Sequence, residues 1–303
     1  MTREAAAYRG RFAPSPTGPL HAGSLLAAVA SYLDARAHGG QWLVRMEDID
    51  PPREIPGAAE SILRTLESFS LHWDENVLFQ STRLSAYEEA LAALSATGLV
   101  FECTCSRRDI AETNAARGRP GSRIYPGTCR EGVVHRRRRS SVRMRVGTGV
   151  VQFVDRLQGT VSQDLETGVG DFILRRRDGL FAYQLAVVVD DAWQGITEVV
   201  RGVDLLDSTA RQIRLQHALG LETPGYMHFP VIVSAGGEKL SKQTGAAPID
   251  ARQRNLTAWK MLQLLGQSPP PELKGDAPEA LWDWAIAHWC PQHLAGRRQL
   301  TES

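Results

Sequence analysis

Apolar residues recur at regular spacings and divide the first hundred residues into helices and strands. Residues 20–37 carry apolar side chains at helical spacing, and residues 57–70 and 82–96 repeat that spacing. Residues 41–46 form a short apolar run typical of a buried strand, and residues 9–18 predict a strand followed by a loop. Alternating strands and helices of this kind predict an α/β fold with a Rossmann-like, doubly wound parallel sheet.

A second region interrupts this alternation. Beyond residue 100 the chain is rich in cysteine and arginine and has no helical period, and it contains short alternating strands such as 141–146. A hairpin signal at Asp178-Gly179, the apolar run 181–189 and a helical stretch at 207–219 then restore the α/β pattern. We therefore predict a split fold, with a first half (1–100), an insert (101–171), a second half (172–245) and a short helical C-terminal stem (246–303).

Composition narrows the class of protein. With 43% hydrophobic residues in 303 positions, the chain can bury the cores of two or three packed units. A net charge of +1 excludes a uniformly basic surface for nucleic acid, so any basic face must be local. Because no stretch has the character of a signal peptide or a membrane span, we expect a cytoplasmic protein in a reducing compartment.

The turn between the first strand and the first helix has the chemistry of an anion site. Residues 14–24 lead into a helix start, where unpaired backbone N–H groups and the helix dipole favour phosphate. Gly23 allows close approach of a nucleotide, and His21 can donate a hydrogen bond to phosphoryl oxygens. An ordinary Pro/Gly turn with a surface histidine would contain the same residues, so the turn alone leaves both interpretations open.

A second candidate is the Gly-, Ser- and Lys-rich segment 234–247. Lys239 and Lys242 flank Leu240 and Ser241, and such a loop could close on a triphosphate and neutralise charge as pyrophosphate leaves. A solvated surface loop is the alternative, because lysines in loops are commonly exposed.

Together the two segments resemble the HIGH and KMSKS signatures of class I aminoacyl-tRNA synthetases. The first is Pro-x-Pro-Thr-Gly-x-x-His-x-Gly over 14–23, and the second is Lys-x-Ser-Lys over 239–242. Further segments, in the same order along the chain, resemble the glutamyl branch of that class, and the resemblance extends over 9–249. These segments are 11–18, 45–50, 183–186 with 189–191, and 200–202, and the departures from the two signatures are Ala22, Ser24, Leu240 and Gln243.

The resemblance implies that ATP, accompanied by Mg²⁺, activates L-glutamate through in-line attack of the α-carboxylate on the α-phosphorus. Catalysis would then depend on positioning and on charge stabilisation. Catalytic contacts with the phosphates are implied for His21, Lys239 and Lys242. The implied ATP-binding residues are Pro14, Thr17, Gly18, His21, Gly23, Ser24, Lys239, Leu240, Ser241 and Lys242.

Glutamate carries two carboxylates and one ammonium group, which explains the charged residues of the motifs. Arg11 and Arg201 are implied as the carboxylate partners and Glu47 as the ammonium partner. A surface ion pair of Glu47 with Arg45 or Arg53 is the alternative. The implied glutamate-binding residues are Arg11, Phe12, Ala13, Pro14, Ser15, Glu47, Tyr183 and Arg201.

Cysteines in the insert predict a metal site. Cys103, Cys105 and Cys129 offer soft thiolate ligands, which favour a structural, tetrahedral zinc ion. By frequency the fourth ligand would be His135, whereas the family resemblance implies Tyr125, which we adopt. Three reduced cysteines without a metal are the remaining alternative.

About sixty residues follow the lysine-rich segment, and we expect no anticodon-binding domain among them. Their four tryptophans have spacings typical of a packed helical tail rather than of a surface that stacks bases. Chains shortened in this way resemble glutamyl-queuosine tRNA(Asp) synthetases. That family activates glutamate without tRNA and attaches it to queuosine in the anticodon loop of aspartate tRNA. The four tryptophans are Trp259, Trp282, Trp284 and Trp289.

The implied partners are therefore ATP, L-glutamate and queuosine-containing tRNA(Asp), with no membrane and no obligate protein partner. The arginine runs at 136–139 and 175–177 are candidate RNA contacts, although a strand with exposed arginines would have the same sequence. Two alternatives stay open. One is a shortened synthetase that charges a tRNA 3′ end, and the other is a catalytically idle paralogue that binds amino acid or RNA.

Overall fold

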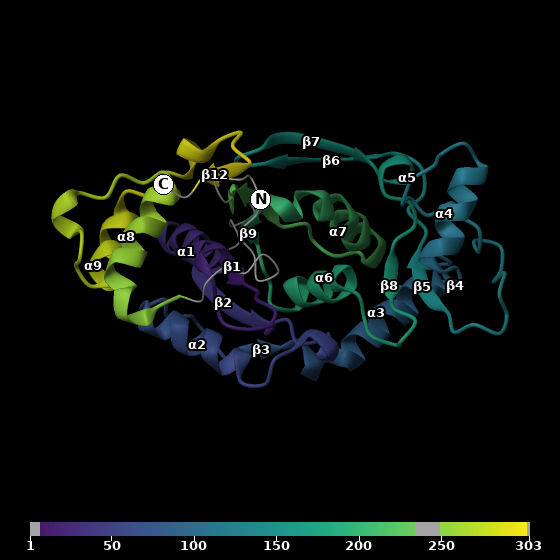
Figure 1. Ribbon diagram of the computed structural model, residues 1–303, viewed down its shortest axis with the longest axis horizontal. Helices are drawn as coiled ribbons and strands as arrows, with labels where there is room; N and C mark the ends of the chain where they lie inside the picture. Colours follow the sequence, from purple (N-terminus) through teal and green to yellow (C-terminus); the bar gives the residue numbers. More distant parts are fainter. Residues whose placement is uncertain (1–6, 234–248, 302–303) are drawn as a thin grey trace, which may run out of the picture.

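The computed structural model describes residues 7–233 and 249–301, and a parallel sheet in two parts runs through its centre (Figure 1). The first part has the order β1-β2-β3, with all pairs parallel. The predicted strand over 41–46 coincides with β2. The strands of this part are β1 (Arg9–Phe12), β2 (Gln41–Met46) and β3 (Leu78–Phe79).

The second part of the sheet has the order β7-β6-β10-β9. β10 pairs in parallel with both β9 and β6, and β7 returns antiparallel to β6. The carbonyl of Arg9 accepts a hydrogen bond from the backbone N–H of Thr197 at 3.0 Å, so β1 and β9 lie side by side. These strands are β6 (Val150–Asp155), β7 (Gly159–Asp164), β9 (Glu198–Gly202) and β10 (Gly225–Phe229).

Helices cover the sheet, and α1 (Ala22–Ala37) is the most central of them. It packs against β1, β2 and β9 on one side and against the C-terminal helices on another, so Leu25, Leu26 and Leu33 are fully buried. The doubly wound α/β fold is confirmed. The other helices of this layer are α2 (Ala58–Ser68), α3 (Leu84–Ala96), α6 (Tyr183–Trp193) and α7 (Leu206–Leu219).

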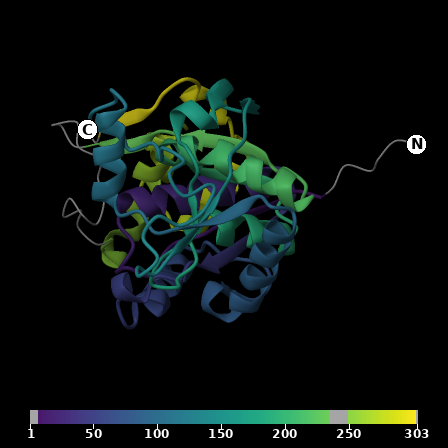
Figure 2. The same cartoon turned by 90° about the vertical axis from the view of Figure 1, so that its right-hand side faces the viewer.

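A small antiparallel sheet of order β4-β5-β8 lies at one end of the molecule, together with α4 and α5. Figure 2 looks onto this end. Ser106 caps α4, because its hydroxyl accepts from the backbone N–H of Asp109 while the Asp109 side chain accepts from Ser106. The elements here are β4 (Val100–Cys103), α4 (Arg107–Ala116), β5 (Ser141–Met144), α5 (Leu165–Gly168) and β8 (Ile173–Arg175).

The β6–β7 hairpin falls within the predicted insert range but is hydrogen-bonded to the central sheet. Tyr226 of β10 is the register partner of Asp155 at the end of β6. In Figure 1 the hairpin runs from the central sheet toward α5. The central sheet therefore takes strands from both sides of the predicted boundary at residue 171.

The C-terminal segment packs against the main core at the end of the molecule opposite α4 (Figure 1). Trp282 is 2% exposed and donates to the carbonyl of Phe69, and the other three tryptophans pack partly buried on the same core. The packed tail is confirmed, with one addition, a short strand that pairs in parallel with β11. The elements are β11 (Val231–Val233), α8 (Arg254–Leu264), α9 (Pro278–Ala287) and β12 (Gln299–Thr301). Over 7–233 and 249–301, no helix has the length and apolarity needed to cross a membrane.

Candidate active site and metal centre

A cavity of about 370 Å³ opens where the carboxyl ends of β1, β9 and β10 meet the start of α1. Ligands of open α/β sheets bind at this edge, beside a reversal of strand order. Two sequence segments that lie more than 150 residues apart supply its walls. The lining residues include Arg11, Phe12, Ala13, Ser15, His21, Gly23, Ser24, Tyr183, Val200, Arg201, Gly202, Phe229 and Pro230.

The first turn of α1 forms one wall of the cavity. His21 is the N-cap residue, and its Nδ1 accepts from the backbone N–H of Ser24 at 3.4 Å. The Ser24 hydroxyl in turn accepts from the backbone N–H of His21 at 2.9 Å. The remaining N–H groups of this turn and the positive end of the helix dipole give the wall an affinity for anions.

Gly202, at the end of β9, keeps the opposite wall open. A Cβ atom built on this residue would lie 2.5 Å from an Asp204 carboxylate oxygen and 3.4 Å from a Val231 methyl carbon. A Cβ atom at this position would displace the Asp204 carboxylate, which also lines the cavity.

A buried ion cluster lies behind Arg11. Its Nε and Nη2 donate to the two carboxylate oxygens of Asp191, at 3.0 and 3.3 Å. Nη1 of Arg45 lies 2.8 Å from the same carboxylate and also donates to Gln194. Burial works to raise the pKa of Asp191, but the Arg11 and Arg45 charges outweigh it, and the pKa lies below its ordinary value. Asp191 therefore fixes the orientation of Arg11 and occupies N–H groups on its Nε and Nη2.

Glu47 follows β2 directly and lines a second cavity, which adjoins the first and shares Ala13, Ser15 and Tyr183 with it. Its backbone N–H donates to the carbonyl of Pro14, which ties the β2 end to the turn before α1. The carboxylate is 9% exposed and lies 3.5 Å from Arg45, and its Oε1 has no hydrogen-bond partner among the described residues. Burial raises the pKa of Glu47 to about 7, against the Arg45 and Arg11 charges. A buried carboxylate that lines a cavity is suited to a cationic ligand group.

Arg201 extends from β9 and has most of its N–H groups occupied. Nε donates to Nε2 of His228 at 3.0 Å, Nη1 to the Tyr183 hydroxyl at 3.3 Å and Nη2 to Thr209 at 2.9 Å. The side chain is buried but lines the first cavity. These bonds fix a guanidinium at the cavity wall in one orientation.

The structure brings most of the predicted substrate residues together. Arg11, Phe12, Ala13, Ser15, Tyr183 and Arg201 line the cavity that His21, Gly23 and Ser24 also line, and Glu47 lines the adjoining one. Pro14, Thr17 and Gly18 lie in the connecting turn and line neither cavity. Lys239, Leu240, Ser241 and Lys242 lie outside the described residues.

Three residues near the site were given no role from the sequence, and a fourth, Arg45, was considered only as a surface partner of Glu47, whereas its side chain is 0% exposed. Asp191 and Arg45 orient Arg11, and His228 with Asp155 lies behind Arg201. For Asp191 the sequence did contain a signal, because an acidic pair directly after the apolar run 181–189 needs partners if it is buried. His228 and Asp155 carried no local signal, because they meet across 73 residues.

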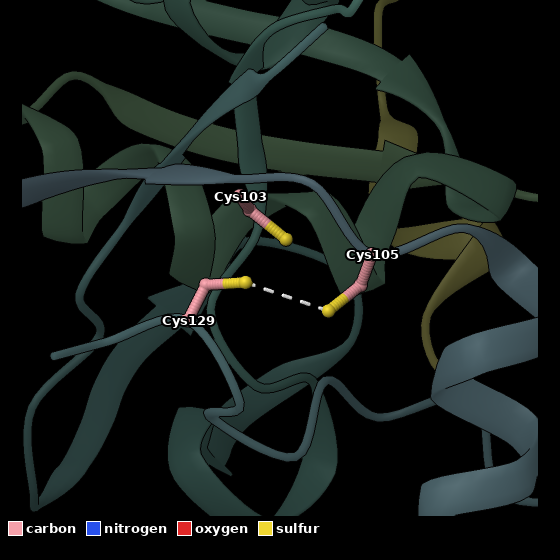
Figure 3. A group of neighbouring side chains, drawn as sticks. All are labelled: Cys103, Cys105 and Cys129. Carbon is pink, nitrogen blue, oxygen red and sulfur yellow. Dashed lines mark hydrogen bonds between the residues drawn. The ribbon is translucent and has the colours of Figure 1, made fainter. Parts of the chain in front are cut away.

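The three insert cysteines form a compact group. Their sulfur atoms lie within 4.8 Å of one another, all three side chains are buried, and Figure 3 shows the sulfur atoms directed toward a common centre. Burial works to raise the pKa of Cys129, but hydrogen bonds, led by the backbone of Thr104 and Val134, outweigh it and hold this pKa at about 6. A group of this kind can hold a soft metal ion.

Tyr125 belongs to this cluster, and His135 lies outside the group of metal-ligand atoms. The Tyr125 hydroxyl lies 3.4 Å from the sulfur of Cys103 and 3.9 Å from that of Cys105. His135 directs its Nε2 to Asp109, at 3.7 Å. Among the described residues, the geometry favours Tyr125 over His135 as the fourth ligand.

Of the predicted RNA contacts, the run at 175–177 makes contacts within the protein. Arg175 pairs with Glu88, Arg176 with Asp50 and Asp178, and Arg177 donates to the carbonyls of Thr104 and Cys105. The run at 136–139 is exposed, with Arg138 paired to Asp109. Of the two predicted runs, that at 136–139 is the more exposed.

Comparison with known proteins identifies the class. Residues 7–264 match the family model for the catalytic domain of class I tRNA synthetases (E and Q), and the chain is a class I tRNA synthetase. It is 56% identical over 282 residues to the glutamyl-Q tRNA(Asp) synthetase of Dechloromonas aromatica, covering 93% of this chain and 94% of that protein. It is 55% identical over 296 residues to that of Chromobacterium violaceum, covering 97% and 98%. The chain belongs to the family of glutamyl-Q tRNA(Asp) synthetases.

Solved structures agree with this family. The glutamate-tRNA synthetase of Elizabethkingia anophelis has a TM-score of 0.82 and 25% identity, covering 98% of this chain and 68% of that one. A glutamate tRNA ligase of Elizabethkingia meningosepticum in complex with its amino acid has a TM-score of 0.77 and covers 98% of this chain and 67% of its own. The resemblance stated from the sequence motifs is therefore confirmed at the level of fold and family.

Proposed function

We propose that this enzyme activates L-glutamate with ATP, without tRNA, and transfers the glutamyl group to the queuosine base of tRNA(Asp). The main support for the activation step is the placement of three charged residues, Arg11, Arg201 and Glu47, around two adjoining cavities. The first of these cavities also reaches the first turn of α1. Two guanidinium groups and one carboxylate complement two carboxylates and one ammonium. The names of the relatives support queuosine in tRNA(Asp) as the acceptor.

In the proposed complex, Glu47 binds the substrate ammonium, and Arg11 and Arg201 bind carboxylates. An ammonium would pair with the Glu47 carboxylate, which lines the second cavity and lies 3.5 Å from Arg45. Tyr183, Ala13 and Ser15 line both cavities and would separate the amino-acid pocket from solvent. In this complex the substrate ammonium would be a positive partner for Glu47, and the two substrate carboxylates would be negative partners for Arg11 and Arg201.

The proposed chemical step is attack of a glutamate α-carboxylate oxygen on the α-phosphorus of ATP, with departure of pyrophosphate. The new C–O–P bond gives glutamyl-adenylate, and the P–O bond to the β-phosphate breaks. The first turn of α1 and His21 would hold phosphate oxygens, and we propose Lys239 and Lys242 for the departing pyrophosphate. Mg²⁺ bound to ATP would neutralise phosphate charge.

The acceptor step distinguishes this proposal from the charging of a tRNA 3′ end. Labelled glutamate should become attached to tRNA(Asp) that contains queuosine and not to the same tRNA with guanosine at that position. Enzymatic removal of the 3′-terminal adenosine, which leaves the queuosine base intact, should leave the transfer unchanged. Attachment that requires the 3′-terminal adenosine would favour a 3′-end synthetase, and no attachment to either tRNA would favour an idle paralogue.

A pH dependence follows from the raised pKa of Glu47, about 7. Below that pH the carboxyl is mainly protonated and loses its attraction for an ammonium group. At pH 6 about a tenth of the sites are ionised and at pH 8 about nine tenths, so KM for glutamate should fall roughly tenfold from pH 6 to pH 8. Steady-state exchange kinetics at constant ionic strength measure this.

Glu47→Gln is the matched variant for this prediction, because it keeps the shape of the side chain and cannot ionise. Its KM for glutamate should be high and nearly independent of pH, while KM for ATP stays close to that of the wild type. A wild-type KM for glutamate that is the same at pH 6 and pH 8 would contradict the role of Glu47.

We propose that the insert holds one structural zinc ion, with Cys103, Cys105, Cys129 and Tyr125 as ligands. Three buried sulfur atoms and one hydroxyl within a few ångströms of one another support this assignment. The ion would link β4 to the loop that contains Cys129, where few apolar side chains pack.

Cys129→Ser should lower the zinc content from about one ion per chain to well below half, and should open residues 101–171 to protease first. Cys290→Ser is the control, because Cys290 lies outside the cysteine group, in the C-terminal segment. Metal analysis and limited proteolysis measure the two effects. Equal zinc content in both variants would exclude this ligand set.

A further inference from the structure

Behind Arg201 lies a buried pair of residues that the proposed chemistry does not use. His228 of β10 is 0% exposed and Asp155 of β6 is 2% exposed. Nδ1 of the His228 ring lies 2.6 Å from Oδ2 of Asp155, and Nε2 accepts from Nε of Arg201 at 3.0 Å. The three side chains form a continuous hydrogen-bonded series from β6 to the cavity wall.

These bonds define the protonation of the ring. The Nε–H of arginine can only donate, so Nε2 of His228 must accept, and the single ring proton lies on Nδ1 facing Asp155. Burial lowers the pKa of His228 against its hydrogen bond with Asp155, which favours this neutral form. The Thr209 hydroxyl lies 3.3 Å from Nε2 and accepts from Nη2 of Arg201, so it can donate to the ring.

Asp155 is held in one orientation by the backbone. Its Oδ1 accepts from the N–H groups of Leu157, Gln158 and His228, at 3.0, 2.9 and 3.2 Å. Only Oδ2 is directed to the ring. The pairing of β6 with β10 therefore fixes the carboxylate, the carboxylate fixes the ring, and the ring fixes Arg201.

We infer that His228 and Asp155 are positioning residues that orient Arg201 for the carboxylate of the amino-acid substrate. This inference rests on the proposed function, because it assigns Arg201 to glutamate. Nε is the guanidinium nitrogen closest to the backbone, so its partner sets the plane in which Nη1 and Nη2 lie. Without that partner the guanidinium can rotate, and the carboxylate loses a pre-oriented donor.

Two substitutions of His228 separate positioning from simple packing. In His228→Gln the amide oxygen can occupy the place of Nε2 and accept from Arg201. In His228→Asn the amide nitrogen occupies the place of Nδ1 and donates to Asp155, and Arg201 loses its acceptor. His228→Asn should raise KM for glutamate about 10-fold or more with KM for ATP unchanged, whereas His228→Gln should stay within about threefold of the wild type.

Asp155→Asn tests the same series through the ring proton. Three backbone N–H groups require an acceptor at Oδ1, so the amide oxygen takes that place and the NH₂ group faces Nδ1. The ring proton must then move to Nε2, where it opposes the N–H of Arg201. KM for glutamate should rise as in His228→Asn.

Nitrogen-15 NMR of the folded chain, together with exchange kinetics, tests the inference. The expected spectrum shows His228 protonated at Nδ1 in the wild type and at Nε2 in Asp155→Asn. A wild-type ring protonated at Nε2 would overturn the inference, whatever the enzyme activates. Equal KM values for glutamate in the two folded His228 variants would also overturn it if the wild type activates glutamate. Absence of glutamate activation in the wild type, with the expected NMR result, would instead refute the proposed function.

Discussion

Asp191→Asn is expected to lower the free energy of unfolding by about 3–5 kcal/mol, because it removes a buried charge that two guanidinium groups share. Arg11 and Arg45 are 3% and 0% exposed, and both contact this carboxylate. An amide oxygen in the place of Oδ1 can keep the contacts with Nε of Arg11 and Nη1 of Arg45, but the amide NH₂ group then opposes Nη2 of Arg11, and the neutral amide balances neither positive charge. Urea unfolding followed by circular dichroism measures the loss.

The ion pair of Asp250 with Arg252 provides the control. Arg252 is 90% exposed, so the pair lies in solvent, and Asp250→Asn should leave the urea midpoint nearly unchanged. The same charge is removed in both variants, and only the burial of the partners differs. If Asp191→Asn were as stable as Asp250→Asn, the buried cluster would contribute little to the fold.

The largest expected loss of activity is that of Arg201→Lys. Lysine keeps the positive charge but cannot donate to His228, Tyr183 and Thr209 at once, so the orientation of the group is lost. We expect kcat/KM for glutamate to fall by roughly 100-fold to 1,000-fold, the range for truncating a buried, hydrogen-bonded charge partner. ATP–pyrophosphate exchange over a range of glutamate concentrations measures it.

Arg108→Lys is the matched control for this variant. Its guanidinium is exposed and pairs with Glu112 within its own helix. This variant should show wild-type exchange kinetics. Full activity of Arg201→Lys would mean that no glutamate carboxylate depends on the guanidinium of Arg201.

The spacing of apolar residues along the chain was sufficient to predict several of the helices and strands that surround the site. The run 41–46 is β2, and the helix predicted over 20–37 begins at Ala22 because His21 caps it. The apolar run 181–189 lies mostly within α6, whose side chains are buried on more than one face, so no single apolar stripe marks it as a helix. The β6–β7 hairpin was missed as part of the central sheet, since its pairing with β10 joins residues about seventy positions apart.

The residues of the site also fall into two groups, those that the sequence identified and those that only the structure revealed. Arg11, Glu47, Tyr183 and Arg201 could be selected because they belong to short motifs with a family resemblance. Their supporting partners could not, because Arg11 meets Asp191 across 180 residues and His228 meets Asp155 across 73. Such contacts depend on how strands are ordered in the sheet, which the spacing of apolar residues does not encode.

ATP–pyrophosphate exchange without RNA, with glutamate, aspartate and glutamine compared at equal concentrations, tests the proposed glutamate activation most directly. Exchange should occur with glutamate, because the proposed site pairs two carboxylates with Arg11 and Arg201 and one ammonium with Glu47. Aspartate and glutamine should support little or none. Exchange with glutamine at the rate of glutamate, or no exchange with any of the three until tRNA is added, would contradict it.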